Sequence, residues 1–247
     1  MERQGYNVFQ ASLATDSRKS IVLTSDPMYG RGLEGTDTWS VDLGITWHPA
    51  SNVSVSLAPA YSYDETLAQY VTAVADPTAT AFYGTRYVFG GITQRTLSMN
   101  TRLNVTFSPN LTLDLFIQPF ISSGDYTEYK ELTAPRQLTK LVYGRDTGTV
   151  TTQVVDGATR YTIDPDGAGP ASSFQFTDPS FTFRSLRGNV VLRWEYLPAS
   201  TLYAVWSRTS SSSLDAGILD FGRDARALFR GPAENIFLVK VNYRLQR

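Results

Sequence analysis

The sequence predicts an all-β fold, an antiparallel transmembrane β-barrel of about 12 strands that this chain forms in whole or in part. Three observations predict it: long segments alternate apolar and polar residues, one type of turn occurs three times, and helical periodicity is absent. No window repeats its apolar residues every three or four positions, and no apolar run reaches the ~18 residues of a transmembrane helix. We expect a single barrel domain over 1–247, with a long outer loop at about 122–183.

The alternation of apolar and polar residues is the strongest of these signals. Leu43, Ile45 and Trp47 share one side of a predicted strand, whereas Asp42 and Thr46 share the other. Successive side chains of a strand point to opposite faces, so a period of two indicates two different environments. The alternating segments are 39–47, 53–63, 97–107, 111–118, 190–196 and 237–245.

The length of these segments favours a membrane protein. Ordinary strands have ~5 to 6 residues, whereas a tilted strand that crosses a bilayer needs ~9 to 11. In a barrel that crosses a membrane, the apolar side chains face lipid and the charged ones face a polar lumen. The alternative is a soluble sandwich or a lipocalin-like barrel with its apolar residues inward. The predicted lumen-facing polar residues are Asp42, Arg102, Asp114, Arg187, Arg193, Glu195 and Lys240.

A turn that occurs three times fixes the expected orientation of the strands. Each copy has an aromatic residue, one spacer and a proline, as in 47–49, 107–109 and 196–198. Proline presets the backbone for a tight turn and cannot continue a strand ladder. Outer-membrane barrels have short periplasmic turns, so we place these three at the periplasmic rim. The expected membrane-interface aromatics, at the two rims together, are Trp39, Trp47, Tyr61, Phe107, Trp194, Tyr196 and Tyr243.

The connections between the strands are less regular. Asp64-Glu65 is expected to be a short turn between strands at 52–63 and 66–75, and Ser210–Ser213 a solvated linker. Within the predicted outer loop, Asp156-Gly157 is a two-residue hairpin signal between two β-rich segments. We therefore expect that loop to contain a hairpin of its own.

The composition excludes several classes of function. The chain has no cysteine, which rules out disulfides, thiolate metal ligands and cysteine nucleophiles. Its formal net charge is -1, so it lacks the basic surface that nucleic acid binding requires. We expect no nucleic acid partner.

Three motifs carry weak chemical signals. The segment 30–35 matches the glycine pattern of a dinucleotide loop, but no helix is expected after it. Asp164 and Asp166 could contribute to a calcium loop, yet the remaining ligands are absent. His48 is the only histidine and would need a neighbouring serine and a third group to catalyse hydrolysis. We therefore assign no catalytic residue, metal or cofactor.

Four stretches resemble a known family. They are 76–89, 118–124, 184–196 and 237–241. Together they resemble the C-terminal outer-membrane barrel of a bacterial domain-of-unknown-function family. Its members carry an N-terminal family-9-type carbohydrate-binding module. The resemblance spans about 60–245 and implies an outer-membrane location and a periplasmic sugar-binding module in the full-length protein. It implies no reaction and no catalytic residue.

The leading hypothesis is an outer-membrane barrel that serves as an anchor or a passage, in glycan capture or uptake. Its partners would be the lipid bilayer and a glycan ligand. Two alternatives remain: a barrel-embedded hydrolase and a soluble all-β ligand carrier. An enzyme is the less favoured class because no catalytic constellation stands out in the sequence.

Overall fold

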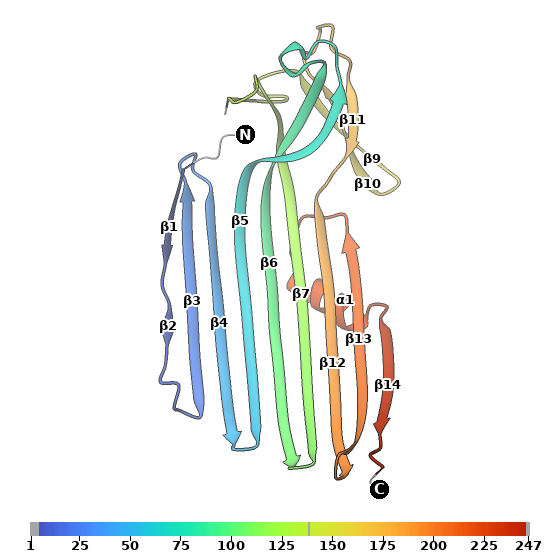
Figure 1. Ribbon diagram of the computed structural model, residues 1–247. Coiled ribbons are helices and arrows are strands. Elements are labelled where there is room, and N and C mark those ends of the chain that lie inside the picture. The colour runs from blue at the N-terminus through green and yellow to red at the C-terminus, as the bar shows by residue number, and fades with distance from the viewer. Residues whose placement is uncertain (1–4, 138, 246–247) are drawn as a thin grey trace.

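The computed structural model describes residues 5–137 and 139–245. The described chain is almost entirely antiparallel β-structure, with one short 3-10 helix, η1 (Thr80–Phe82), and one α-helix, α1 (Phe221–Arg230) (Figure 1). The all-β antiparallel prediction is therefore confirmed. The strands are β1 (Tyr6–Gln10), β2 (Leu13–Ala14), β3 (Ile21–Gly32), β4 (Asp37–Ala50), β5 (Val53–Ala75), β6 (Thr85–Ser108), β7 (Leu111–Leu132), β8 (Lys140–Val142), β9 (Thr149–Val155), β10 (Ala158–Asp164), β11 (Phe174–Thr177), β12 (Phe181–Leu197), β13 (Ser200–Leu214) and β14 (Glu234–Asn242).

Eleven of these strands form one sheet. Its order is β1-β3-β4-β5-β6-β7-β12-β13-β14, with β2 paired to β3 and β8 paired to β7. The three predicted proline-containing turns form hairpins that connect β4 to β5, β6 to β7 and β12 to β13 at the lower end (Figure 1). Each of these turns follows a shift in register, at 47/50, 106/108 and 195/197.

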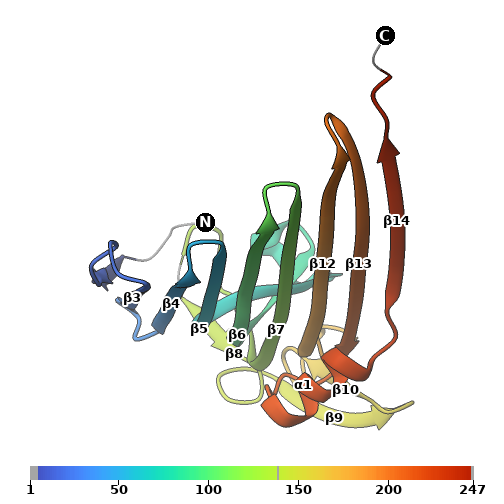
Figure 2. The ribbon, with the colours of Figure 1, turned by 90° about the horizontal axis from the view of Figure 1, so that it is seen from below.

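The sheet is open. The path of paired strands ends at β1 on one side and β14 on the other, and the ladders of the described residues do not join these two edges. Seen from below, the sheet bends into a shallow trough with α1 on its convex side (Figure 2). Closure into a barrel is thus not part of the described structure.

Strand β5 is longer than the sequence indicates. β5 continues through Asp64-Glu65 to Ala75, so the expected turn there is wrong. Asp64 accepts a hydrogen bond from Thr38 at 2.8 Å, and Glu65 accepts one from the backbone N–H of Asp37 at 3.0 Å. These charged side chains are satisfied by the neighbouring strand β4, so the ladder continues past them.

Above the trough, the chain forms a small packed unit that we call the cap. It consists of the upper ends of β5, β6 and β7 together with η1 and β8 to β11, and it contains most of the predicted outer loop (Figure 1). β9 and β10 form the expected hairpin, whose turn residues Asp156 and Gly157 have φ of 52° and 81°. The buried core of the cap is Val88, Tyr129, Tyr143, Ile163 and Phe174.

The segment between β13 and β14 differs from the prediction. Ser210–Ser213, expected in a solvated linker, belongs to β13, and Ser210 donates to the carbonyl of Pro232 at 2.7 Å. The helix α1 follows, with Asp220 as its N-cap residue, accepting from the backbone N–H of Arg223. In the part of the chain that is described, no helix combines the length and the apolar character needed to cross a membrane.

Candidate functional site

The ladders divide the sheet into two faces of opposite character. Because residues directly opposite each other on paired strands share a face, the register assigns every strand residue to one side. We call the side that contains Leu43, Leu57 and Leu103 the apolar face, and the side that contains Asp42 and Arg102 the polar face. Further members of the apolar face are Leu97, Leu113, Leu115, Ile117, Val190, Leu192, Ala204, Trp206, Phe237, Val239 and Val241.

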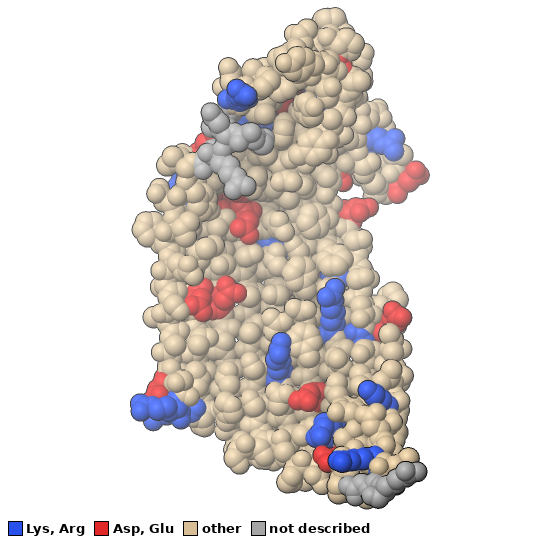
Figure 3. All heavy atoms as spheres, viewed as in Figure 1, with Lys and Arg blue, Asp and Glu red and all other residues tan. Residues whose placement is uncertain are grey.

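All seven residues predicted to be lumen-facing lie on the polar face, which is the concave side of the trough. The space-filling view shows their charges spread over the sheet (Figure 3). Acidic residues gather over β3 to β5, where Asp26 lies directly opposite Asp42. Basic residues gather over β6 to β14. The seven residues are Asp42, Arg102, Asp114, Arg187, Arg193, Glu195 and Lys240.

Several of these charges have partners on the same face. Arg193 and Glu195 form an ion pair at 3.2 Å, and the Arg102 guanidinium lies over the Phe116 ring at 5.3 Å from its centroid. The Asp114 carboxylate accepts from an Asn104 side-chain amide. Among the described residues, the Arg193–Glu195 contact is the one ion pair within the predicted set. The polar face is therefore a charged, water-compatible surface with few mutually neutralising contacts.

Aromatic residues mark both ends of the apolar face. Near the lower turns lie Trp47 and Trp194, with Phe107 and Tyr196 at the register shifts and Tyr243 just beyond β14. At the other end, Trp39 contacts the rings of Tyr61 and Tyr63, with centroids 5.1 and 6.0 Å apart. The two groups are separated by the length of the alternating segments, as membrane-interface aromatics of a barrel would be.

Most of the apolar face has no protein cover. Leu43 is 41% exposed, Trp47 45% and Val239 68%. Soluble monomers rarely expose contiguous apolar patches larger than a few hundred Å². An uncovered apolar surface that runs across so many strands is therefore the feature of the sheet that a proposed function must explain.

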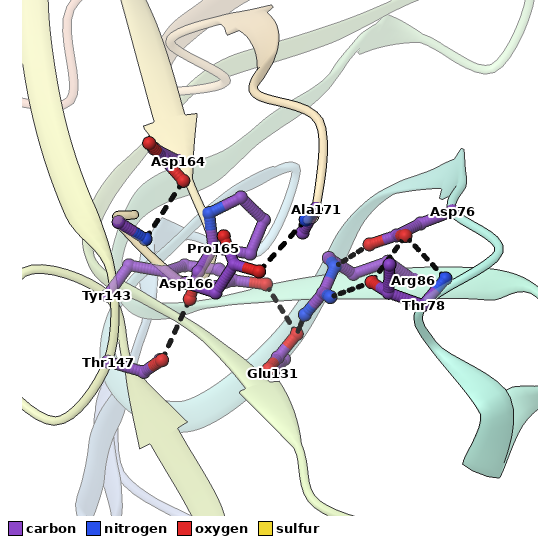
Figure 4. Close-up of polar contacts among 11 residues, drawn as sticks. Asp76, Thr78, Arg86, Glu131, Tyr143, Thr147, Asp164, Pro165, Asp166 and Ala171 are labelled. Carbon is purple, nitrogen blue, oxygen red and sulfur yellow. Dashed lines mark hydrogen bonds and ion pairs between the residues drawn. The ribbon is translucent and has the colours of Figure 1, made fainter. Parts of the chain in front are cut away.

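The cap contains a buried cluster of charges that the sequence did not reveal as a unit. Arg86 on β6 donates from Nε to Asp76 at 2.7 Å and pairs through Nη1 with Glu131 on β7 (Figure 4). Thr78 donates its backbone N–H and its hydroxyl to Asp76, at 2.9 and 2.6 Å, and Tyr143 donates to Glu131 at 2.9 Å. Asp76, Arg86 and Glu131 come from three strand ends, so the cluster ties the upper sheet together.

The protonation states of this cluster are fixed by its contacts. Burial opposes the charged form of Asp76, but hydrogen bonds from Thr78 and Arg86 outweigh it and hold the pKa of the carboxyl below its usual value. Burial also opposes the charge of Arg86, yet its bonds to Glu131 and Asp76 raise the pKa of the guanidinium. Burial and the neighbouring Glu131 raise the pKa of Tyr143. Asp76 and Arg86 thus stay ionised at neutral pH, and Tyr143 is a neutral donor.

A cavity of about 230 Å³ opens beside the cluster. Thr78, Arg86 and Glu131 supply its polar lining, and the rings of Phe82 and Tyr87 meet edge to face at 5.8 Å. Ligand pockets for drug-sized molecules have ~300 to 1,000 Å³, so this cavity admits only a small polar molecule or one end of a larger one.

The three weak motifs form no recognisable site in the described residues. The glycines of 30–35 lie at the β3–β4 hairpin, with no helix after them. Asp164 and Asp166 accept from the backbone N–H groups of Gly167 and Ala171 within their own loop (Figure 4). No group of three potential metal ligands occurs in the described parts of the chain. His48 Nε2 lies 3.4 Å from Ser54 Oγ, but no third side chain is bonded to this ring among the residues described.

Comparison with known families assigns the chain to one family. The model of a family described as a domain of unknown function (DUF5916) matches residues 1–246. The chain belongs to that family. This confirms the expected membership of a domain-of-unknown-function family and leaves the N-terminal carbohydrate-binding module and the outer-membrane location as predictions. No curated protein and no solved structure matches this DUF5916 chain significantly.

Two features of this DUF5916 domain escaped prediction for different reasons. Asp76, Thr78 and Arg86 stood in stretches that carried the family resemblance, but their partner Glu131 is far away in sequence and has no local signal. The helix α1 did have a signal: Asp220 in the N-cap position, then Phe221, Ala225 and Leu228 at helical spacing. The segment is short, so it did not appear as a long periodic window.

Proposed function

We propose that this chain is the membrane-spanning part of a bacterial outer-membrane β-barrel and serves as an anchor or a passage in glycan capture or uptake. The observation that carries the proposal is the uncovered apolar face, bounded by aromatic residues at both ends. Lipid would cover this face, and the polar face would line the interior.

The proposal requires paired edges. Lipid offers no hydrogen bonds to backbone groups, so a sheet crosses a bilayer only when its edge strands are paired. In the described structure β1 and β14 are the edges. In the membrane, these edges would pair with each other or with further strands.

The polar face and the cap support a role in handling polar solutes. The mixed charges of the polar face suit a water-filled path, since rings of charged side chains tune the selectivity of pores. The cap lies beyond one end of that path, and its cavity combines aromatic rings with Arg86 and Glu131. Such a combination can contact both the apolar and the hydroxyl faces of a sugar. The family resemblance, which implies a sugar-binding module in the full-length protein, also supports a role in glycan handling.

A soluble ligand carrier fits less well, because its apolar residues would be covered by the protein itself. A barrel-embedded hydrolase lacks a catalytic triad among the described residues. His48 has a serine within 3.4 Å but no third group to orient it in the described structure. The exposed apolar face therefore argues against the soluble carrier, and the missing third group argues against the hydrolase.

Reconstitution tests the proposal. We expect the chain to require detergent, to enter phospholipid vesicles, and to resist extraction from them by alkaline carbonate. Planar bilayers then separate the two roles: stepwise conductance that added oligosaccharides reduce indicates a passage, and silent insertion indicates an anchor. A chain that stays monomeric in buffer without detergent would contradict the membrane proposal.

A further inference from the structure

The helix α1 is held firmly against the upper part of the sheet. Asp224 is fully buried and forms an ion pair at 2.9 Å with Arg184, itself 8% exposed. Leu228 packs against Ile121 and Leu186 in the same place. Ile121 and Arg184 are directly opposite each other in the register, on the apolar face. The helix therefore docks on the apolar, convex side of the trough.

Although it is docked, α1 leaves much of its own apolar surface uncovered. Phe221, Ala225, Leu228 and Phe229 follow the spacing of one helical stripe. Leu228 is buried, but Phe221 and Phe229 are 65% and 61% exposed. Just before the helix, Ile218 is exposed as well. A docked helix that still exposes two phenylalanines needs another apolar partner.

The other side of α1 is basic. Arg226 and Arg230 are exposed and lie one turn apart, on the side of the helix away from Leu228. The Arg223 guanidinium donates hydrogen bonds to the Asp224 carboxylate at 2.9 Å and to the carbonyl of Ile218 at 2.6 Å. An apolar stripe on one side and exposed arginines on the other is the pattern of helices that lie in a membrane interface.

The height of α1 on the sheet agrees with such a position. Leu186, its contact on β12, lies eleven residues before Leu197 at the lower turn. Eleven residues of strand extend about 36 Å, or about 25 to 30 Å along the membrane normal at a tilt of ~35–45°. The apolar band of outer-membrane barrels is ~25 Å tall. Tyr63, in the upper aromatic group, lies at a similar height above its turn, ten residues from Val53.

We propose that α1 is an interfacial helix that binds lipid at the end of the apolar face distant from the three turns. Phe221 and Phe229 enter the acyl chains next to the sheet, and Arg226 and Arg230 bind phosphate groups of anionic lipid heads. The inference rests on the proposed membrane function, because the apolar face must be coated by lipid for α1 to meet it at this depth.

Fluorescence quenching can test both claims separately. The chain has no cysteine, so single variants carry one label each. We would label Phe229→Cys, Leu103→Cys on the apolar face and Ser56→Cys on the polar face with bimane. Phosphatidylglycerol vesicles would contain nitroxide lipids labelled near the headgroup or deep in the acyl chain. We expect at least twofold stronger quenching by the shallow nitroxide at position 229, by the deep one at 103, and weak quenching by both at 56.

The outcomes distinguish the two proposals. If position 103 is quenched and position 229 is not, protein or water covers α1, and the interfacial helix is wrong while the membrane function stands. If neither position is quenched, the membrane function fails, and the helix proposal fails with it.

The arginines have their own test. Electron spin resonance with spin-labelled lipids measures which headgroup prefers the protein surface. We expect at least a twofold preference for phosphatidylglycerol over phosphatidylcholine, which the double variant Arg226→Gln/Arg230→Gln reduces toward none. Arg136→Gln, at an exposed arginine of the cap, is the matched control and should keep the preference. An unchanged preference in the double variant would overturn phosphate binding by these arginines.

Discussion

The cap and the trough-shaped sheet below it share three strands but bury their apolar residues in opposite ways. In the cap, Val88, Ile163 and Phe174 are between 0 and 8% exposed, and two layers of strands enclose them. In the sheet, Leu43 and Val239 are 41% and 68% exposed. β5, β6 and β7 run through both regions, so each of these strands passes from the enclosed core of the cap to the exposed apolar face of the sheet. The cap thus encloses its own apolar side chains, whereas the described part of the sheet leaves its apolar face uncovered.

The largest difference between the two regions should come from removing a buried side chain. Ile163→Ala leaves a cavity in the fully enclosed cap core, and such losses cost about 2–5 kcal/mol. Val239→Ala removes methyl groups that face outward, where lipid can fill the space, so we expect less than about 1 kcal/mol. Hydrogen exchange of cap amides and urea unfolding in vesicles measure the two effects. Equal losses would mean that Val239 is also enclosed by protein.

A charge placed on each face of one strand should sharpen the comparison. Leu57 and Ala58 are neighbours on β5, and the register puts Leu57 on the apolar face, midway between its two ends, and Ala58 on the polar face. Arginine on the lipid side of a barrel costs about 2–4 kcal/mol near the middle of the bilayer. We therefore expect Leu57→Arg to lower the free energy of unfolding in vesicles by that amount and Ala58→Arg to lower it by less than about 1 kcal/mol.

The reverse order would contradict the assignment of the faces. If Ala58→Arg is the more damaging variant, the polar face is the enclosed one. Folding of both variants in detergent, checked by circular dichroism, separates a failure of insertion from a failure to fold.

The alternation of side chains made the faces predictable, because it is a local property of each strand. Leu43 and Asp42 are adjacent in one strand, so their side chains point to opposite faces of the sheet. Contacts between segments that are distant in sequence produce no local pattern of this kind. Asp64 and Glu65 indicated a turn because two adjacent charged residues are uncommon within a strand. In the structure, β4 supplies hydrogen-bond donors to both carboxylates. Glu131 likewise gains its role only from Arg86, on another strand.

The helix α1 and the serines before it show a second limit. Ser210–Ser213 has no apolar residue to indicate a face, so its place in β13 is set by pairing with 183–186 on β12. Closure of the sheet is a third limit, since it depends on whether distant edges meet. Local patterns therefore predict how the residues of each strand divide between the two faces, but not which distant groups complete the structure.

The smallest effect we expect concerns the charge cluster of the cap, which distinguishes it from the sheet by its response to acid. Because Asp76 has a lowered pKa in the folded protein, its carboxylate stabilises the cap above the ordinary aspartate pKa of about 4. That contribution is lost as the pH falls from about 4 toward the lower pKa of the folded state. Asp76→Asn keeps an acceptor for Thr78 but loses the ion pair with Arg86, a change of about 1–3 kcal/mol at pH 7.

Limited proteolysis of vesicle-bound protein between pH 7 and pH 2.5, using an acid-stable protease at the low end, measures this response. The wild-type cap should become sensitive below about pH 4, while Asp76→Asn should be more sensitive at pH 7 and approach the wild type at low pH. If lipid covers the apolar face as proposed, the sheet should stay protected throughout, because contacts of Leu57 and Leu103 with acyl chains would not titrate. A variant that keeps the wild-type acid response in full would show that Asp76 does not carry the effect. Sensitivity of the sheet and cap at the same pH would instead mean that the two regions unfold as one unit.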